Sequence, residues 1–150
     1  MIIRHTERVG RIMDKEKLVE LLNRDLELEF RSIVQYTQHV ATVKGMEFQP
    51  MAEMIRPHLR QELEHATVLA EQIAFLGGEP TTRVPDVPNE TEPQQALLLD
   101  LELEERQLGG YRERFEQAEA MGLPDVAEAL RPLLEQTQDH VRDLRGALSQ

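Results

Sequence analysis

The sequence predicts an all-α fold, an antiparallel four-helix bundle made of two helical hairpins. Leu, Glu, Gln, Arg and Ala abound, and aromatic residues make up only 4% of the 150 residues, a composition that favours long helices over sheets. Apolar residues recur at helical spacing in four segments separated by glycine and proline. The second half of the chain also repeats the first at an offset of 75 positions. We expect one bundle domain over residues 14–150, preceded by an N-terminal extension over residues 1–13.

The first hairpin is predicted from its start and stop residues. Asp14 is a suitable N-cap for a first helix that runs to about Lys44, where a glycine follows. The second helix starts near Pro50, a residue that suits the first helical turn. It continues to Leu76, where two glycines end it.

A long linker over residues 77–92 separates the two hairpins. Its three prolines and two glycines exclude a regular helix. Sixteen extended residues reach roughly 50 Å, and a helix of about thirty residues is roughly 45 Å long. The linker can therefore cross the whole bundle, so that the second and third helices run parallel. Bundles with one such long crossover are a recognised class.

The second hairpin follows the linker. Its first helix begins near residues 91–93, where Thr91 and Gln94 match a capping box, and it ends near Gly122. Its second helix covers about residues 124–148. Two adjacent glycines at positions 109 and 110 predict either a close helix approach or a local bulge.

The internal repeat is the strongest pattern in the sequence. The segment DLELE at Asp25–Glu29 recurs at Asp100–Glu104, and residues 51–65 match residues 126–140 at seven of fifteen positions without a gap. Both of the longer segments carry a proline inside the helical pattern, which predicts a bend in each helix. A pseudo-twofold bundle of this kind places equivalent side chains around one axis, which is the geometry of a paired metal site.

Acidic and imidazole side chains occupy matched positions on all four predicted helices. Residues three apart share a helix face, so one Glu-x-x-His pair can bind a single ion. Alone, such a pair is more often part of a solvated face, but two glutamates at matched inward positions are costly to bury without a partner. Di-iron carboxylate bundles take one Glu from each of two helices and a Glu-x-x-His pair from each of the other two. Five of these six ligands are present: Glu29, Glu62, His65, Glu104 and His140.

The sixth ligand position is occupied by Thr137, where the pattern requires a glutamate. Gln136, four residues before His140, reaches the same face, or a water fills the gap. The site then holds two unequal ions, or only one. Tyr36, seven residues after Glu29, is the candidate catalytic residue. It and its repeat equivalent either hydrogen-bond the carboxylates across the core or fill the core.

The sequence resembles the ferritin-like superfamily and is most similar to its bacterioferritin branch. By that resemblance the five ligands above fall at the family's ferroxidase ligands. The implied activity is oxidation of Fe(II) by dioxygen or peroxide at two iron ions, with manganese or zinc as alternative metals. The resemblance covers roughly residues 14 to 148 and depends on these segments: Leu22–His39, Glu62–Pro80, Asp100–Glu105 and Asp139–His140.

Departures from the bacterioferritin pattern limit what the resemblance implies. Leu63 stands where haem-binding bacterioferritins carry a methionine, and leucine cannot ligate iron, so no haem is expected. The chain ends ten residues after His140, where cage-forming members continue, so we expect a homodimer rather than a 24-subunit cage. The leading hypothesis is a ferroxidase-type oxidoreductase for iron handling. The alternative is a non-enzymatic metal- or partner-binding bundle with a degenerate site, which Thr137 supports.

Composition excludes other classes of function. The net charge of −11 repels nucleic acid and anionic membranes and attracts cations, so the expected partners are metal ions and the oxidant. No apolar run approaches the length of a membrane span. The chain contains no cysteine and no signal-like N-terminal stretch, and we expect a cytoplasmic protein.

Overall fold

The structure, a computed structural model, describes residues 13–149 and contains no strand within that range. The all-α prediction is therefore confirmed. The expected N-terminal extension lies outside the described residues except for Met13. The helices are α2 (Lys15–Thr42), α3 (Gln49–Phe75), α4 (Pro93–Ala120) and α5 (Pro124–Leu148).

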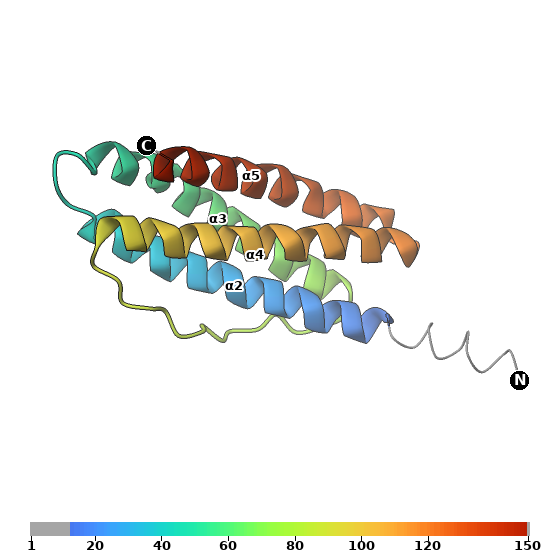
Figure 1. Cartoon of the computed structure of the whole chain (residues 1–150). Coiled ribbons are helices and arrows are strands. Elements are labelled where there is room, and N and C mark those ends of the chain that lie inside the picture. The colour runs from blue at the N-terminus through green and yellow to red at the C-terminus, as the bar shows by residue number, and fades with distance from the viewer. Residues whose placement is uncertain (1–12, 150) are drawn as a thin grey trace, which may run out of the picture.

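The four helices pack as a square bundle. Helix α2 packs against α3 and α4, and α5 packs against the same two helices, whereas the backbones of the diagonal pairs in the described chain stay further apart. In Figure 1, α2 and α5 run in one direction and α3 and α4 in the other. The linker returns along the bundle beside α2 before α4 begins. The predicted long crossover between two parallel helices is confirmed.

The linker is attached to α2 by side chains that face it. Asn23 Nδ2 donates to the carbonyl oxygen of Glu79 at 3.0 Å, and Asn23 Oδ1 accepts from Thr81 N at 2.8 Å. Further along, Arg83 Nη1 lies 3.1 Å from Glu27 Oε1. These contacts hold the linker in an extended path along α2, although the linker has no regular secondary structure of its own.

Helix ends agree with the predicted signals except at the start of α4. Asp14 Oδ1 accepts from Lys17 N at 2.8 Å, as expected of an N-cap. The predicted capping box at Thr91 is wrong by one residue, because Glu92 is the N-cap of α4. Pro93 occupies the first turn, so the residue just before it takes the cap position. The two Glu92 carboxylate oxygens accept from the next two free amides of the helix, at 3.1 and 2.8 Å.

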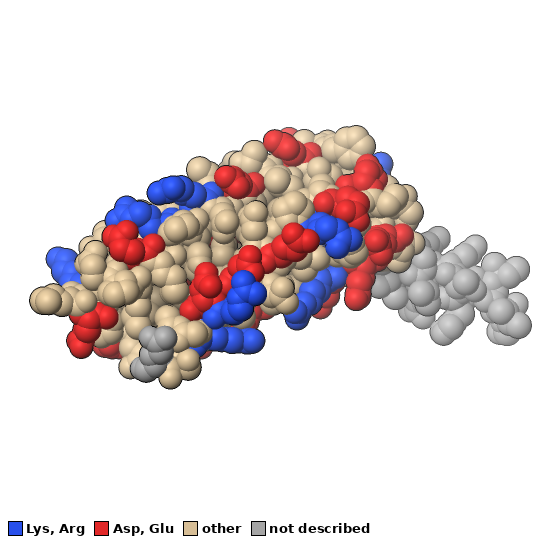
Figure 2. Space-filling view, turned by 90° about the horizontal axis from the view of Figure 1, so that it is seen from above, with Lys and Arg blue, Asp and Glu red and all other residues tan. Residues whose placement is uncertain are grey.

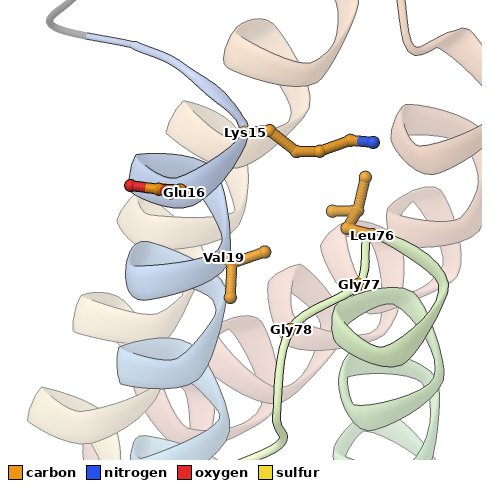
Figure 3. Close-up of a pocket in the computed structure, with 6 residues that line it drawn as sticks. All are labelled: Lys15, Glu16, Val19, Leu76, Gly77 and Gly78. Carbon is orange, nitrogen blue, oxygen red and sulfur yellow. The ribbon is translucent and has the colours of Figure 1, made fainter.

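Two glycines allow close approaches that a side chain would block. A Cβ on Gly78 would lie 2.4 Å from Val19 Cγ1, so this glycine lets the end of α3 pass the start of α2 (Figure 3). A Cβ on Gly110 would lie 2.9 Å from Asp25 Oδ1. Since α4 is a regular helix through this point, the structure favours the close helix approach over the bulge.

The bundle interior is divided along its length into three layers. One apolar cluster, which includes Leu22, Leu69 and Leu130, fills the end where α2 begins. A smaller cluster around Ile55 and Leu144 lies at the other end. Between them lies a layer of buried polar and charged side chains, to which all four helices contribute. The candidate site is this middle layer.

Candidate metal centre

All five predicted ligands converge in the middle layer. Each helix turns its acidic or imidazole side chain inward, because these residues continue the buried stripe of the helix. None is more than 1% exposed to solvent. The residues are Glu29 on α2, Glu62 and His65 on α3, Glu104 on α4, and His140 on α5.

The donors form two groups that meet at Glu62. In the first, His65 Nδ1 lies 3.5 Å from Glu29 Oε1 and 3.9 Å from Glu62 Oε2. In the second, His140 Nδ1 lies 2.9 Å from Glu62 Oε1 and 3.1 Å from Glu104 Oε1. Glu62 thus faces both histidines with different oxygens, as a bridging carboxylate must.

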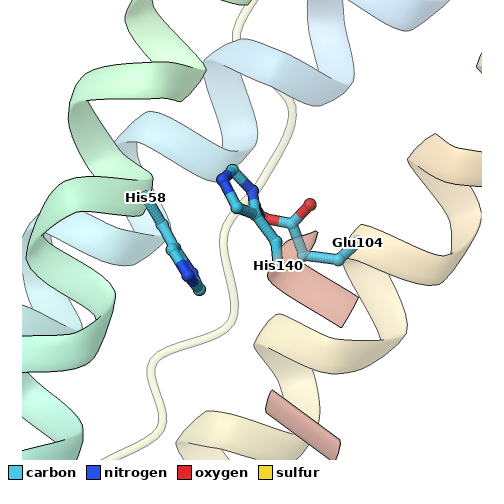
Figure 4. Close-up of side chains that lie close together, drawn as sticks. All are labelled: His58, Glu104 and His140. Atoms are coloured by element: carbon cyan, nitrogen blue, oxygen red, sulfur yellow. Dashed lines mark hydrogen bonds and ion pairs between the residues drawn. The ribbon is translucent and has the colours of Figure 1, made fainter. Parts of the chain in front are cut away.

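A third histidine, which the sequence analysis missed, belongs to the second group. His58 on α3 is 3% exposed, and its ring stacks on that of His140 with centroids 4.0 Å apart. His58, Glu104 and His140 each offer a ligand atom within 4.8 Å of the others. Figure 4 shows the three side chains together, from α3, α4 and α5. The same distance criterion groups Glu29, Glu62 and His65, so two clusters of three ligands lie side by side.

Several donor atoms in these clusters are buried without a hydrogen-bond partner. Leaving such an atom unpaired costs about 1–3 kcal/mol, and more when the group is charged. A cation bound between the carboxylates and imidazoles would pair all of them at once. The atoms are Glu29 Oε2, Glu104 Oε2, His58 Nδ1 and His65 Nδ1.

Burial shifts the protonation of the acidic ligands. It raises the pKa of Glu29, Glu62 and Glu104 to about 7 each, and the charge of a neighbouring carboxylate adds to the shift at Glu62 and Glu104. Burial alone lowers the pKa of His140, but hydrogen bonds to Glu104 and Glu62 and their charges outweigh it and raise that pKa to about 10. Burial and the charge of His140 lower the pKa of His58. Without a cation, the layer therefore holds protons near neutral pH.

Two buried tyrosines hold the glutamates of the opposite hairpin. Tyr36 Oη on α2 donates to Glu104 Oε1 at 2.7 Å, and Tyr111 Oη on α4 donates to Glu29 Oε1. Burial raises the pKa of both phenols well above the ordinary value, so both remain donors. Of the two roles considered for Tyr36, the structure shows the hydrogen bond across the core.

Two glutamines contact the Nε2 atoms of His65 and His140. These nitrogens face away from the carboxylates and are called the outer nitrogens. Gln136 Oε1 lies 2.7 Å from His65 Nε2, and Gln61 Oε1 lies 2.5 Å from His140 Nε2. An amide oxygen only accepts, so each Nε2 carries a proton and each Nδ1 points to the carboxylates. Gln136 therefore faces the outer nitrogen of His65 across the bundle, while Thr137 is buried on the inner face.

Further buried polar pairs flank the centre, and sequence reasoning missed them. Arg114 Nε donates to Asp25 Oδ2 at 2.9 Å, and His39 Nδ1 lies 2.8 Å from Asp100 Oδ2. Asp25 and Asp100 are repeat equivalents, as are His39 and Arg114, so the offset of 75 could have indicated both pairs. Gln107 also enters the layer, where its Nε2 is 3.5 Å from Glu62 Oε2.

Other features of the surface are separate from the centre. A pocket of about 190 Å³ lies at the end of the bundle between the start of α2 and the end of α3 (Figure 3), and no histidine lines it. Figure 2 shows acidic side chains in a band along one face with basic side chains beside them. None of the helices within residues 13–149 is apolar over a length that could cross a bilayer.

Curated proteins similar to this chain are bacterioferritins. A bacterioferritin of Rhodobacter capsulatus is 28% identical over 134 residues, which are 89% of this chain and 83% of that protein. A bacterioferritin of Desulfovibrio desulfuricans is 35% identical over 69 residues, which are 46% of this chain and only 38% of that protein.

Solved structures with the same fold extend the similarity over most of the chain. A protein from Bacillus anthracis strain Ames, described as ferritin-like and diiron-carboxylate, superposes with a TM-score of 0.86 at 30% identity, covering 90% of this chain and 97% of that one. The Desulfovibrio desulfuricans bacterioferritin, described with a diiron site in different catalytic states, gives a TM-score of 0.81 at 25% identity, covering 90% and 80%. A family model for the ferritin-like domain matches residues 19–150. The chain therefore belongs to the ferritin-like family and is bacterioferritin-like.

Proposed function

We propose that this protein handles iron by binding two Fe(II) ions in the middle layer and oxidising them with dioxygen or peroxide. The observation that carries the proposal is the set of buried carboxylate and imidazole atoms that lack partners and face one another. The relatives named bacterioferritin and the neighbour described as diiron-carboxylate support iron as the metal.

The donor set fits the proposed metal. Carboxylate oxygens and imidazole nitrogens suit iron, with manganese and zinc as the alternatives. Glu62 faces both histidines, so it can hold two ions close enough to act on one oxidant. Because a glutamine oxygen contacts Nε2 of His65 and of His140, Nδ1 is the nitrogen that can bind a metal on each ring. On His140 the metal must first displace the Nδ1 proton.

Iron bound here would supply the electrons of the reaction. Two Fe(II) substrate ions give one electron each to a dioxygen molecule, which takes up two protons and leaves as hydrogen peroxide. With hydrogen peroxide as oxidant, the same two electrons and two protons yield two water molecules. The protein residues hold and orient the ligands of the ions, since Tyr36 fixes Glu104 and Tyr111 fixes Glu29. The apolar clusters on both sides of the layer exclude water.

A second candidate function follows from Thr137. A hydroxyl is a poor replacement for a carboxylate ligand, so a non-enzymatic bundle that binds metal at a degenerate site remains the alternative. Such a protein would bind fewer than two ions per chain and would not turn over. The homodimer and the absence of haem at Leu63, which is 60% exposed, stay predictions.

Anaerobic titration with Fe(II), followed by oxygen, tests the proposal. We expect two ions per chain and, on mixing with oxygen, the near-ultraviolet absorbance of Fe(III). The rate must fall in Glu62→Ala and remain unchanged in the exposed neighbour Glu64→Ala. Binding of less than one ion per chain, with no change in absorbance, would favour the degenerate site.

A further inference from the structure

We propose that His58 is a metal ligand of this centre and replaces the carboxylate that is missing at Thr137. The inference builds on the proposed function, since it adds a ligand to the same metal centre. It assigns His58, Glu104 and His140 to one ion and Glu29 and His65 to the other, with Glu62 shared between the two.

Position along α3 places His58 on the ligand face. It lies four residues before Glu62 and seven before His65, and with 3.6 residues per turn all three project to one side of the helix. His58 is buried at 3% exposure and offers a nitrogen within 4.8 Å of the donors of Glu104 and His140 (Figure 4).

The His58 ring is held in the same way as the two predicted histidine ligands. Its Nε2 lies 3.2 Å from Asp143 Oδ2, so this nitrogen carries a proton that the carboxylate accepts. Its Nδ1 is buried and has no partner. His65 and His140 show the same division, with an outer Nε2 on a glutamine oxygen and an inner Nδ1 facing the carboxylates. An outer acceptor that fixes the ring of a metal-binding histidine is the usual arrangement in proteins.

The two halves of the internal repeat differ at two positions that affect the cluster of His58, Glu104 and His140. Residue 137 would be the glutamate equivalent to Glu62, but it is a threonine. Residue 133, the equivalent of His58, is a leucine. The α5 side therefore lacks a carboxylate next to His140, whereas the α3 side carries an imidazole that stacks on the His140 ring. The second position then has two histidines, with Glu104 of its own and Glu62 shared.

The two positions consequently differ in chemistry. The position with His58 has two imidazoles, Glu104 and a share of Glu62. Its neighbour has one imidazole, Glu29 and the other share of Glu62. Asp143, the partner of His58, lines a surface pocket of about 530 Å³ together with Met51 and Met54. We expect two binding steps with separate affinities.

Calorimetric titration with Co(II), a redox-stable substitute for Fe(II), tests the inference through stoichiometry. Wild type is expected to bind two ions per chain, His58→Gln one, and His58→Gln/Thr137→Glu two again, because the double variant restores a carboxylate at the vacant position. His39→Gln is the matched control, since His39 is equally buried but pairs with Asp100, and it should bind two ions. Two ions with unchanged affinities in His58→Gln would overturn the inference and leave the proposed function intact. No binding to wild type would overturn both.

A crystal of wild-type protein grown with Co(II) gives a test that does not depend on the folding of any variant. Anomalous scattering at the cobalt edge is expected to show two ions, one of them in contact with Nδ1 of His58. A second ion bound by Glu104 and His140 with His58 turned away, or a single ion bound without His58, would contradict the assignment.

Discussion

The α2–α3 hairpin and the α4–α5 hairpin can be compared position by position, because the offset of 75 residues aligns them. Four pairs of residues around the centre are identical, and their contacts cross from one hairpin to the other. Each tyrosine bonds a glutamate of the opposite hairpin, and each glutamine bonds a histidine of the opposite hairpin. The pairs are Glu29 and Glu104, Tyr36 and Tyr111, Gln61 and Gln136, and His65 and His140.

The hairpins differ at two positions whose side chains would contact the metal directly. Glu62 is matched by Thr137, and His58 by Leu133. The difference teaches that the tyrosine and glutamine contacts and four of the candidate ligands retain the pseudo-twofold symmetry, whereas the bridging position and the position of His58 do not. One hairpin supplies the bridging carboxylate and the additional histidine, so we expect the two halves to respond differently to equivalent substitutions.

The largest effect is expected from Glu62→Gln, since Glu62 alone faces both histidines. Loss of an outer contact to a ligand costs about 10–100-fold in metal affinity, so removal of the bridging carboxylate should cost at least about 100-fold. The amide keeps the shape but carries no charge. Because burial raises the pKa of Glu62 to about 7, its ionised form destabilises the metal-free fold at pH 8, so the variant should melt at a higher temperature than wild type. Calorimetric titration with Co(II) measures the loss of metal affinity, and thermal melts measure the gain in melting temperature.

The exposed Glu64→Gln is the control for Glu62→Gln, because it makes the same chemical change on the same helix. It should alter neither the affinity nor the melting temperature. If Glu62→Gln bound two ions as tightly as wild type, the bridging role would be wrong.

Metal affinity should rise with pH, most steeply below about pH 7. Burial raises the pKa of Glu29, Glu62 and Glu104 to about 7, so below that pH an incoming ion must displace their protons. Each displaced proton changes the affinity by about tenfold per pH unit. Above pH 7 a shallower rise should continue, because the pKa of His140 is raised to about 10 and its Nδ1 proton is still displaced.

The sign of the stability change follows from the same pKa values. A carboxyl whose pKa is higher in the folded protein than in the unfolded chain destabilises the metal-free fold increasingly as pH rises through that range. Bound metal removes this penalty, so the gain in melting temperature on adding Co(II) should grow between pH 5 and pH 8. A gain that is constant or falls over this range would show that the buried carboxyls do not bind the ion.

Replacing the two glutamines that contact the histidines, one at a time, should show that the two metal positions have different affinities. Gln61→Leu frees the outer nitrogen of His140, and Gln136→Leu frees that of His65. We expect each to weaken one binding step by about 10–100-fold, with a different step affected in each variant. Titration with Co(II) resolves the steps, and the exposed Gln138→Leu serves as control. Equal weakening of both steps in both variants would contradict the division into two clusters.

The fold and the convergence of five candidate ligands could be predicted because each depends on a local pattern. Apolar spacing locates the helices, glycine and proline locate their ends, and linker length sets the crossover. The Glu-x-x-His spacing indicates Glu62 and His65, and the repeat adds His140 and the matched glutamates Glu29 and Glu104. At the start of α4, two local signals competed, and Pro93 outweighed the Thr91 capping pattern.

Other features depend on how the hairpins are rotated against each other. His58 was missed because its repeat equivalent is Leu133, although its spacing from Glu62 and His65 places all three on one face. The contact from Gln136 to the outer nitrogen of His65 joins α5 to α3, and no pattern within either helix states which nitrogen faces which partner. Bundle geometry, rather than helix periodicity, decides such contacts.

The smallest effect is expected from the two tyrosines, which make equivalent bonds in opposite directions. Tyr36→Phe and Tyr111→Phe each remove one donor to a buried carboxylate and should each lower the free energy of unfolding by about 1.5 kcal/mol. If both residues only hold a glutamate in place, both variants should also slow Fe(II) oxidation to a similar extent in stopped-flow absorbance. A much larger loss in Tyr36→Phe, at equal stability and unchanged Co(II) affinity, would give Tyr36 a role in the reaction itself. That outcome would mean that the symmetry of the outer contacts does not extend to the chemistry, because one of two identically bonded hydroxyls would then serve the oxidant and the other would not.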